Sequence, residues 1–141
     1  MKYVLDSSVG LKWVLPEPDS GRAIRLRDEY NAGTHELLAP DIFIPEIANA
    51  LVAAERQSRI KTGEAAIFFH AIVRNAPILH ATPPLLIRAM AIALATRRAV
   101  YDCIYVALAE AEGCEFVTAD DQFIRLLRPT FPFLVRLVDV P

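Results

Sequence analysis

The sequence predicts an α/β fold with a parallel sheet, because short apolar segments alternate with longer segments that carry helix signals. The segments with the length and composition of strands cover residues 3–5, 36–39, 78–80, 115–118 and 134–138. No internal repeat, low-complexity tract or linker interrupts the 141 residues. We therefore expect a single domain over residues 1–141.

Proline, glycine and small polar residues mark the ends of the expected helices. Asp6 follows the first strand and is suited to capping a helix that Pro16 would stop. Pro45 fits the first turn of a long helix, where its missing N–H is not needed, and Gly113 fits the end of another. The expected helices cover residues 9–15, 19–30, 63–74, 83–97 and 102–113, a long segment from residue 45, and a short one after residue 120.

Composition excludes two broad classes of protein. Hydrophobic residues make up 54% of the chain and charged residues 23%, which excludes a disordered protein. The formal net charge of −2 excludes a protein that holds nucleic acid by overall basic charge. A nucleic-acid site would therefore depend on metal ions and a few local arginines, and part of the apolar excess is expected to face another protein chain.

Cysteine usage and hydropathy predict a cytoplasmic protein with no membrane association. Cys103 and Cys114 match no metal-binding or redox spacing, and Lys2 leads directly into a strand-like segment where a signal peptide would have an apolar run. No stretch reaches the roughly 18 uninterrupted apolar residues that a membrane span needs. A reducing compartment is the expected setting.

Four acidic residues are expected to converge at one edge of the sheet. Asp6 and Asp120 directly follow the strands at residues 3–5 and 115–118. Glu46 and Asp102 fall in the first turns of expected helices, where the helix dipole favours a carboxylate. In doubly wound sheets, binding residues gather at the carboxyl ends of the strands, near the point where the strand order reverses.

A cluster of carboxylates favours divalent-cation chemistry. Neighbouring carboxylates raise each other's pKa unless cations neutralise them, and oxygen-only ligands suit Mg²⁺ or Mn²⁺. Such ions can bind phosphate oxygens, lower the pKa of an attacking water and stabilise a leaving alkoxide. Taken singly, Asp6, Asp102 and Asp120 are explained equally well as helix caps.

Four stretches of the sequence resemble the PIN-domain nucleases, and in particular the VapC toxins of VapBC toxin–antitoxin modules. These stretches are VLDSSV (residues 4–9), PEIANAL (45–51), YDCIYVALAEAEG (101–113) and FVTADDQF (116–123). They occur in the order of the family and span nearly the whole chain. The resemblance implies a PIN-like fold: a five-stranded parallel sheet of order 3-2-1-4-5, counted along the chain, with helices on both faces.

The resemblance also implies an activity and partners. It implies a Mg²⁺- or Mn²⁺-dependent endoribonuclease that leaves a 3′-hydroxyl and a 5′-phosphate on RNA. It further implies the toxin component of a type II toxin–antitoxin system, with a cognate antitoxin as partner and a homodimer as the working form.

Residue by residue, the resemblance assigns the catalytic and metal-binding roles to the acidic residues Asp6, Glu46, Asp102 and Asp120. Ser8, Asn49 and Thr118 are expected to orient the carboxylates or bound water, with capping or an ordinary polar contact as the alternative for each. Asp121 is a second acid where the family pattern needs one. We expect it to be a solvated neighbour, with a supplementary ligand as the alternative.

Two other functions remain open from the residues. In the first, a phosphohydrolase or phospho-acceptor domain would use Asp6 as a nucleophile, although Ser8 stands where such a pair would have a second Asp. In the second, the fold would be a catalytically silent binding module, which the presence of all four acids disfavours.

Overall fold

The central feature of the structure is a five-stranded, fully parallel sheet of order β3-β2-β1-β4-β5, as expected from the resemblance. The computed structural model describes residues 1–141. The strands are β1 (Lys2–Leu5), β2 (Glu36–Pro40), β3 (Ile78–His80), β4 (Glu115–Thr118) and β5 (Leu134–Arg136). The strand order reverses next to β1, so the carboxyl ends of β1 and β4 lie side by side.

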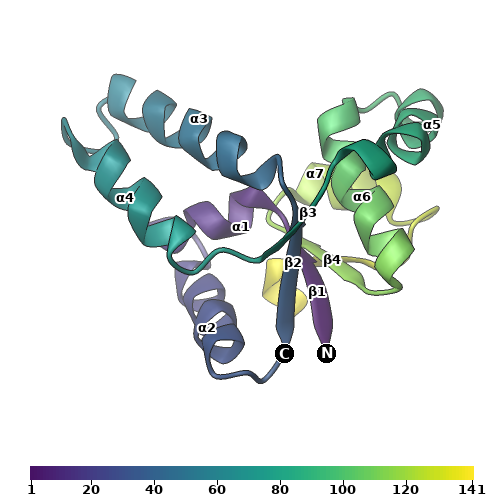
Figure 1. Cartoon of the computed structure of the whole chain (residues 1–141), viewed down its shortest axis with the longest axis horizontal. Helices are drawn as coiled ribbons and strands as arrows, with labels where there is room; N and C mark the ends of the chain where they lie inside the picture. The colour runs from purple at the N-terminus through teal and green to yellow at the C-terminus, as the bar shows by residue number, and fades with distance from the viewer.

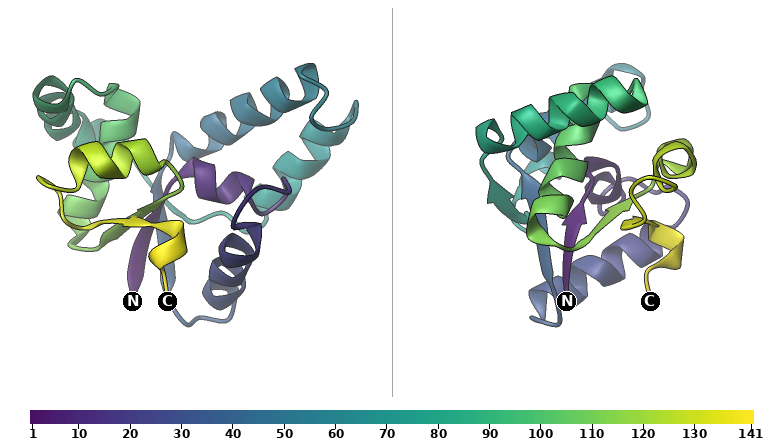
Figure 2. Two further views of the ribbon diagram at one scale, coloured as in Figure 1. Left: turned by 180° about the vertical axis from the view of Figure 1, so that it is seen from behind. Right: turned by 90° about the vertical axis from the view of Figure 1, so that its right-hand side faces the viewer.

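Helices cover both faces of this sheet. In Figure 1, the pair α5–α6 lies on one side of the central strands and the elements α1 to α4 lie on the other. The left view of Figure 2, in which the molecule is seen from behind, brings α7 to the front. The helices are α1 (Ser7–Leu11), α2 (Ser20–Asn31), α3 (Phe43–Arg56), α4 (Glu64–Val73), α5 (Leu86–Thr96), α6 (Val100–Glu112) and α7 (Asp121–Leu127). Two 3₁₀ turns, η1 (Pro83–Leu85) and η2 (Leu137–Asp139), complete the fold.

The core is built around β1 and α6. Val4 and Leu5 are fully buried, and every residue from 103 to 109 is buried as well. A helix buried on all sides in this way is apolar around its whole circumference. Because α6 contacts β1, β2 and β4 as well as α5, its position over the sheet is set by packing on several sides.

The register of the sheet brings the ends of β1 and β4 level with each other. Leu5 pairs with Val117, and the backbone N–H of Asp6 then donates to the carbonyl of Val117 at 3.0 Å. The hydrogen-bonded ladder thus continues one residue past β1. The residue at which β1 gives way to α1 is therefore held against the end of β4.

Two elements expected after residue 98 have different bounds in the structure. The helix expected to open at Asp102 begins two residues earlier, at Val100, so Asp102 is its third residue and still in its first turn. The strand expected to run to residue 138 ends at Arg136, and Leu137–Asp139 form η2. The reason is the partner strand: β5 pairs only with β4, and Arg136 pairs with Thr118, the last residue of β4.

The first helix is also shorter than expected. α1 ends at Leu11, and the chain continues towards Pro16 in tighter turns, where Trp13 N–H donates to the Gly10 carbonyl at 3.1 Å. The Trp13 indole N–H donates to the carbonyl of Ala23 at 2.9 Å, which ties this turn to α2. None of the helices combines the length and the apolar character that a membrane crossing requires.

Gly10 allows α1 to approach α3 closely, and its replacement tests this packing. A Cβ at Gly10 would lie 2.8 Å from Cζ of Phe43, a ring that is itself fully buried. We expect Gly10→Ala to lower the free energy of unfolding by about 1–3 kcal/mol through overpacking, measured by chemical denaturation. Gly21→Ala is the matched control, because nothing lies within 4 Å of its Cβ position and it is also helical. Equal stability of both variants would contradict the close approach.

Candidate active site

The carboxylate of Asp6 is held by two hydroxyl groups from different elements. Its Oδ2 accepts a hydrogen bond from Ser8 Oγ at 2.7 Å, at the start of α1. The same oxygen accepts a hydrogen bond from Thr118 Oγ1 at 2.8 Å, at the end of β4. Asp6 occupies the N-cap position of α1, but its side chain makes no capping hydrogen bond. Its carboxylate is therefore oriented towards the sheet edge.

The two hydroxyls extend this arrangement into the segment between β4 and α7. Ser8 Oγ accepts a hydrogen bond from the backbone N–H of Ala119 at 3.2 Å, and Thr118 Oγ1 accepts one from the N–H of Asp120 at 3.1 Å. Each hydroxyl thus donates to Asp6 and accepts from the backbone. This network, formed by Asp6, Ser8, Thr118 and the two N–H groups, fixes the position of Asp120 relative to Asp6.

Glu46 reaches the site from the first turn of α3 and is held by a buried tyrosine. Tyr105 donates its hydroxyl proton to Oε1 of Glu46 at 2.6 Å, and its ring stacks on Phe116 with a centroid separation of 5.5 Å. Burial, followed by the negative charges of Asp6 and Glu46, raises the pKa of Tyr105. The phenol therefore stays protonated and available as a donor.

Arg98 lies between the two remaining acids. Its Nη2 is 3.8 Å from Oδ2 of Asp102 and 3.7 Å from Oδ2 of Asp120, while the guanidinium carbon is 5.2 Å from the centre of the Phe123 ring. The Nε of Arg98 is buried and has no hydrogen-bond partner. Asp120 also caps α7, since its Oδ1 accepts from the backbone N–H of Phe123 at 3.0 Å.

A small hollow separates three of the carboxylates. Its volume is about 20 Å³, enough for roughly one water molecule. It is lined by Asp6, Asp102, Thr118 and Asp120, with Phe116 and Phe123 as its apolar wall. Glu46 is not among its lining residues, so the structure brings Asp6, Asp102 and Asp120 together and leaves Glu46 beside them.

Burial raises the pKa of three of the four predicted catalytic acids. Burial is the main cause of a raised pKa at Asp6, and the charge of Asp102 adds to it, while the hydrogen bonds from Ser8 and Thr118 act in the opposite direction. Burial also raises the pKa of Glu46 and of Asp102. At Asp102 the Arg98 charge opposes this rise, and Asp120 adds to it.

The carboxylate oxygens of these groups are the donors that an oxygen-preferring divalent cation binds. No set of three or more His, Cys, Asp or Glu side chains is close enough together in the structure to enclose a metal ion. However, the hollow has about the volume of a single small occupant, and three of its lining side chains are carboxylates whose mutual repulsion a cation would relieve. Mg²⁺ and Mn²⁺ prefer such donors and bind through one or two carboxylates with waters completing the shell.

The remaining predicted site residues, Asn49 and Asp121, do not line the hollow. Asn49 is exposed on α3 and makes no side-chain hydrogen bond, so its orienting role stays a prediction. Asp121 is exposed at the start of α7 and does not line the hollow. Tyr105 and Arg98 contact the acids, whereas the sequence favours a core position for Tyr105 and either a surface position or a phosphate contact for Arg98. Their spacing from Asp102, three residues on and four residues back, is the signal that could have found them.

Comparison with known proteins identifies similar chains over nearly the full length. Residues 3–128 match the family model of the PIN domain. Ribonuclease VapC3 of Pyrobaculum aerophilum is 33% identical over 137 residues, covering 96% of this chain and 98% of the relative.

Two solved structures share the fold. The crystal structure of PAE2754 from Pyrobaculum aerophilum superposes with a TM-score of 0.72 at 20% identity and covers 98% of this chain and 85% of its own. The structure of VapBC2 from Rickettsia felis, bound to a DNA fragment from their promoter, gives a TM-score of 0.62 at 16% identity and covers 96% and 97%.

The raised pKa of Asp6 predicts that its ionised carboxylate lowers the free energy of unfolding at neutral pH. Because the folded chain binds this proton more tightly than the unfolded chain, the stability due to this group is present in acid and is lost as the pH rises through the raised pKa. A tenfold difference in proton affinity corresponds to about 1.4 kcal/mol. We expect Asp6→Asn, whose amide oxygen can still accept both hydroxyls, to raise the melting temperature at pH 7.5 in EDTA.

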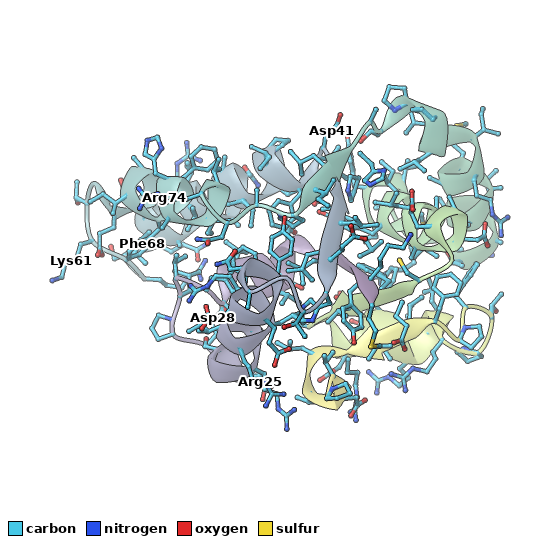
Figure 3. All side chains as sticks on the ribbon, turned by 60° about the horizontal axis from the view of Figure 1, so that its bottom comes forward. Arg25, Asp28, Asp41, Lys61, Phe68 and Arg74 are labelled. Atoms are coloured by element: carbon cyan, nitrogen blue, oxygen red, sulfur yellow. The ribbon has the colours of Figure 1, made fainter.

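The gain should shrink below the ordinary pKa range of aspartate, where the parent carboxyl is also neutral. Asp28→Asn serves as the control, since Asp28 is exposed on α2 (Figure 3) and should show no such gain. A lower melting temperature for Asp6→Asn at both pH values would show that the carboxylate stabilises the fold.

Proposed function

Because the chain belongs to the PIN-domain family, we propose that it is a Mg²⁺- or Mn²⁺-dependent endoribonuclease that hydrolyses phosphodiester bonds in RNA. The relative that is 33% identical over 96% of the chain is named a ribonuclease. The observation that supports the proposal most is the hollow of about 20 Å³ that carries the carboxylates of Asp6, Asp102 and Asp120. We propose that residues 1–141 act as one nuclease domain.

Asp6, Asp102 and Asp120 would hold the metal, with Glu46 beside them. A bound Mg²⁺ or Mn²⁺ would lower the pKa of the attacking water and stabilise negative charge on the phosphate and the leaving oxygen. The protein contributes orientation. Ser8 and Thr118 hold Asp6 through hydrogen bonds of 2.7 and 2.8 Å, which keeps one carboxylate oxygen engaged and leaves the other available.

Tyr105 and Arg98 complete this arrangement. Tyr105 restrains Glu46 through its 2.6 Å hydrogen bond, so that Glu46 points to the same edge as Asp6. Arg98 supplies a positive charge within 4 Å of both Asp102 and Asp120. A guanidinium in this position can also contact a non-bridging oxygen of the substrate phosphate, because arginine matches phosphate geometry well.

We further propose that the chain is the toxin of a type II toxin–antitoxin system and binds a cognate antitoxin. The solved structure of VapBC2 shares its fold, and α3 and α4 extend as a hairpin away from the strands (Figure 1). Between them lies an apolar cavity of about 440 Å³ whose lining includes Val52, Ala66 and Phe69. RNA as substrate and two unpaired cysteines agree with a cytoplasmic location.

A homodimer is proposed as the working form. On α5, Ile87 and Leu94 are 80% and 84% exposed, and Met90 between them is 50% exposed. Their spacing places all three on one face of the helix. The opposite face packs on α6, so this apolar stripe is left for another chain.

The metal-dependent activity is tested directly by RNA cleavage. We expect the purified chain to cleave RNA with Mg²⁺ or Mn²⁺ and to lose cleavage in EDTA. Asp102→Asn should lower kcat/KM at least about a hundredfold, because it removes negative charge from the proposed metal site without changing side-chain size. Asp28→Asn, on the exposed face of α2, should cleave as the parent does. Unchanged cleavage by Asp102→Asn would rule out the proposed site.

The homodimer is tested by light scattering after gel filtration. We expect the parent to have twice the chain mass of 15.7 kDa, and Leu94→Glu to have the mass of one chain, because a charge in the α5 stripe would be desolvated on association. Leu126→Glu is the matched control, since Leu126 is exposed on α7 outside the stripe. A monomeric parent at all concentrations would refute the dimer.

A further inference from the structure

A cavity of about 540 Å³ lies between α7 and β5 and is rich in arginine. Three of the six lining residues are Arg125, Arg128 and Arg136, and the others are Asp121, Ile124 and Pro129. We call this cavity the arginine pocket. It shares no lining residue with the hollow between the carboxylates.

The arginines of this pocket outnumber the carboxylates near them. Asp139 accepts from Arg136 Nε at 2.9 Å and from Arg136 Nη2 at 3.2 Å, and it is 3.9 Å from Arg128 Nη2. Arg128 is further fixed by a 3.1 Å hydrogen bond from its Nε to the carbonyl of Leu134. Arg125 forms no ion pair and is exposed. Three guanidinium groups therefore face the two carboxylates of Asp121 and Asp139, in a chain whose formal net charge is −2.

The arginine pocket adjoins the acidic site at the same edge of the sheet. Arg136 ends β5 and pairs in register with Thr118, whose hydroxyl donates to Asp6. Asp121 lines the pocket and directly follows Asp120, which lines the hollow. A strand of nucleic acid with one phosphate at the hollow would therefore pass the pocket with a neighbouring part of its backbone.

We propose that the arginine pocket binds a backbone phosphate of the RNA substrate, next to the phosphate that is cleaved. This inference rests on the proposed ribonuclease function and assigns it a substrate contact. The acidic site repels a polyanion, so binding needs positive charge close by. Asp139 holds Arg136 and Arg128 in position before RNA binds, which reduces the conformational entropy lost on binding. Arg125 supplies the unpaired charge.

The test measures binding of a single-stranded RNA by fluorescence anisotropy over a range of salt concentrations. The chain carries Asp102→Asn throughout, so that the RNA stays intact. Arg125→Gln in this background should weaken binding about three- to tenfold for RNAs of different sequence, and reduce the slope of log K against log salt by about 0.7. Arg125→Lys should restore most of the slope, because it keeps the charge. Arg74→Gln is the matched control, since Arg74 is exposed at the end of α4 (Figure 3), does not line the pocket between α7 and β5, and forms no ion pair.

Cleavage by the otherwise unchanged chain gives an independent measurement. Arg125→Gln should raise KM while kcat stays near that of the parent, because the lost contact is made equally in the ground and transition states. If Arg125→Gln equals Arg74→Gln in affinity, salt slope and KM while the parent cleaves RNA, the pocket does not bind RNA and the ribonuclease proposal still stands. A parent chain that neither binds nor cleaves RNA would overturn both. If the pocket instead binds an acidic protein segment, Arg125→Gln and Arg74→Gln should likewise give equal RNA affinity, salt slope and KM.

Discussion

The hydrogen bonds that Asp6 accepts from Ser8 and Thr118 join the ends of β1 and β4, and the organisation of the site depends on them. The two hydroxyls accept from the backbone N–H groups of Ala119 and Asp120 in turn. A single carboxylate oxygen thereby connects α1, β4 and the start of α7. If this connection were lost, the backbone pairing of β1 with β4 would remain, but the carboxylate of Asp6 would no longer be linked by hydrogen bonds to the turn that carries Asp120.

This arrangement concentrates negative charge where water is partly excluded. Burial raises the pKa of Asp6, Glu46 and Asp102, so each of these groups is less stable in its ionised form than it would be in water. Arg98 and Tyr105 offset part of this cost, the first through its charge and the second through its hydrogen bond. The repulsion that remains among these carboxylates is what the proposed divalent cation would relieve.

The sequence predicts the part of the site that follows from strand topology. Asp6 and Asp120 each follow an apolar strand, and parallel strands end at a common edge, so their proximity could be expected. The buried contacts were harder to foresee. Tyr105 lies in an apolar helix and has the character of a core residue. Its hydroxyl can donate to Glu46 only because α6 packs across β1, β2 and β4. Arg98 likewise looks like a surface residue until the turn before α6 is known.

The arginine pocket depends on the register and the end of β5, which are harder to predict from the sequence than the proximity of Asp6 and Asp120. Arg125 and Arg128 are three residues apart and so share a face of α7, but Arg136 meets them only because it pairs with Thr118 at the end of β5. The sequence predicted that β5 would run two residues further, which would have placed Asp139 differently with respect to Arg136 and Arg128. Strand ends are set by the partner strand, and a single sequence carries little information about them.

A divalent cation that binds between the gathered carboxylates should stabilise the folded chain. The most direct measurement is the melting temperature of the metal-free chain at pH 7.5 as Mn²⁺ is added. A ligand that binds only the folded state stabilises it by about RT ln(1 + [L]/Kd), so the melting temperature should climb steadily with Mn²⁺ concentration. The same titration should leave Asp102→Asn almost unmoved. A flat response in the parent, or an equal rise in both chains, would contradict a metal site at these residues.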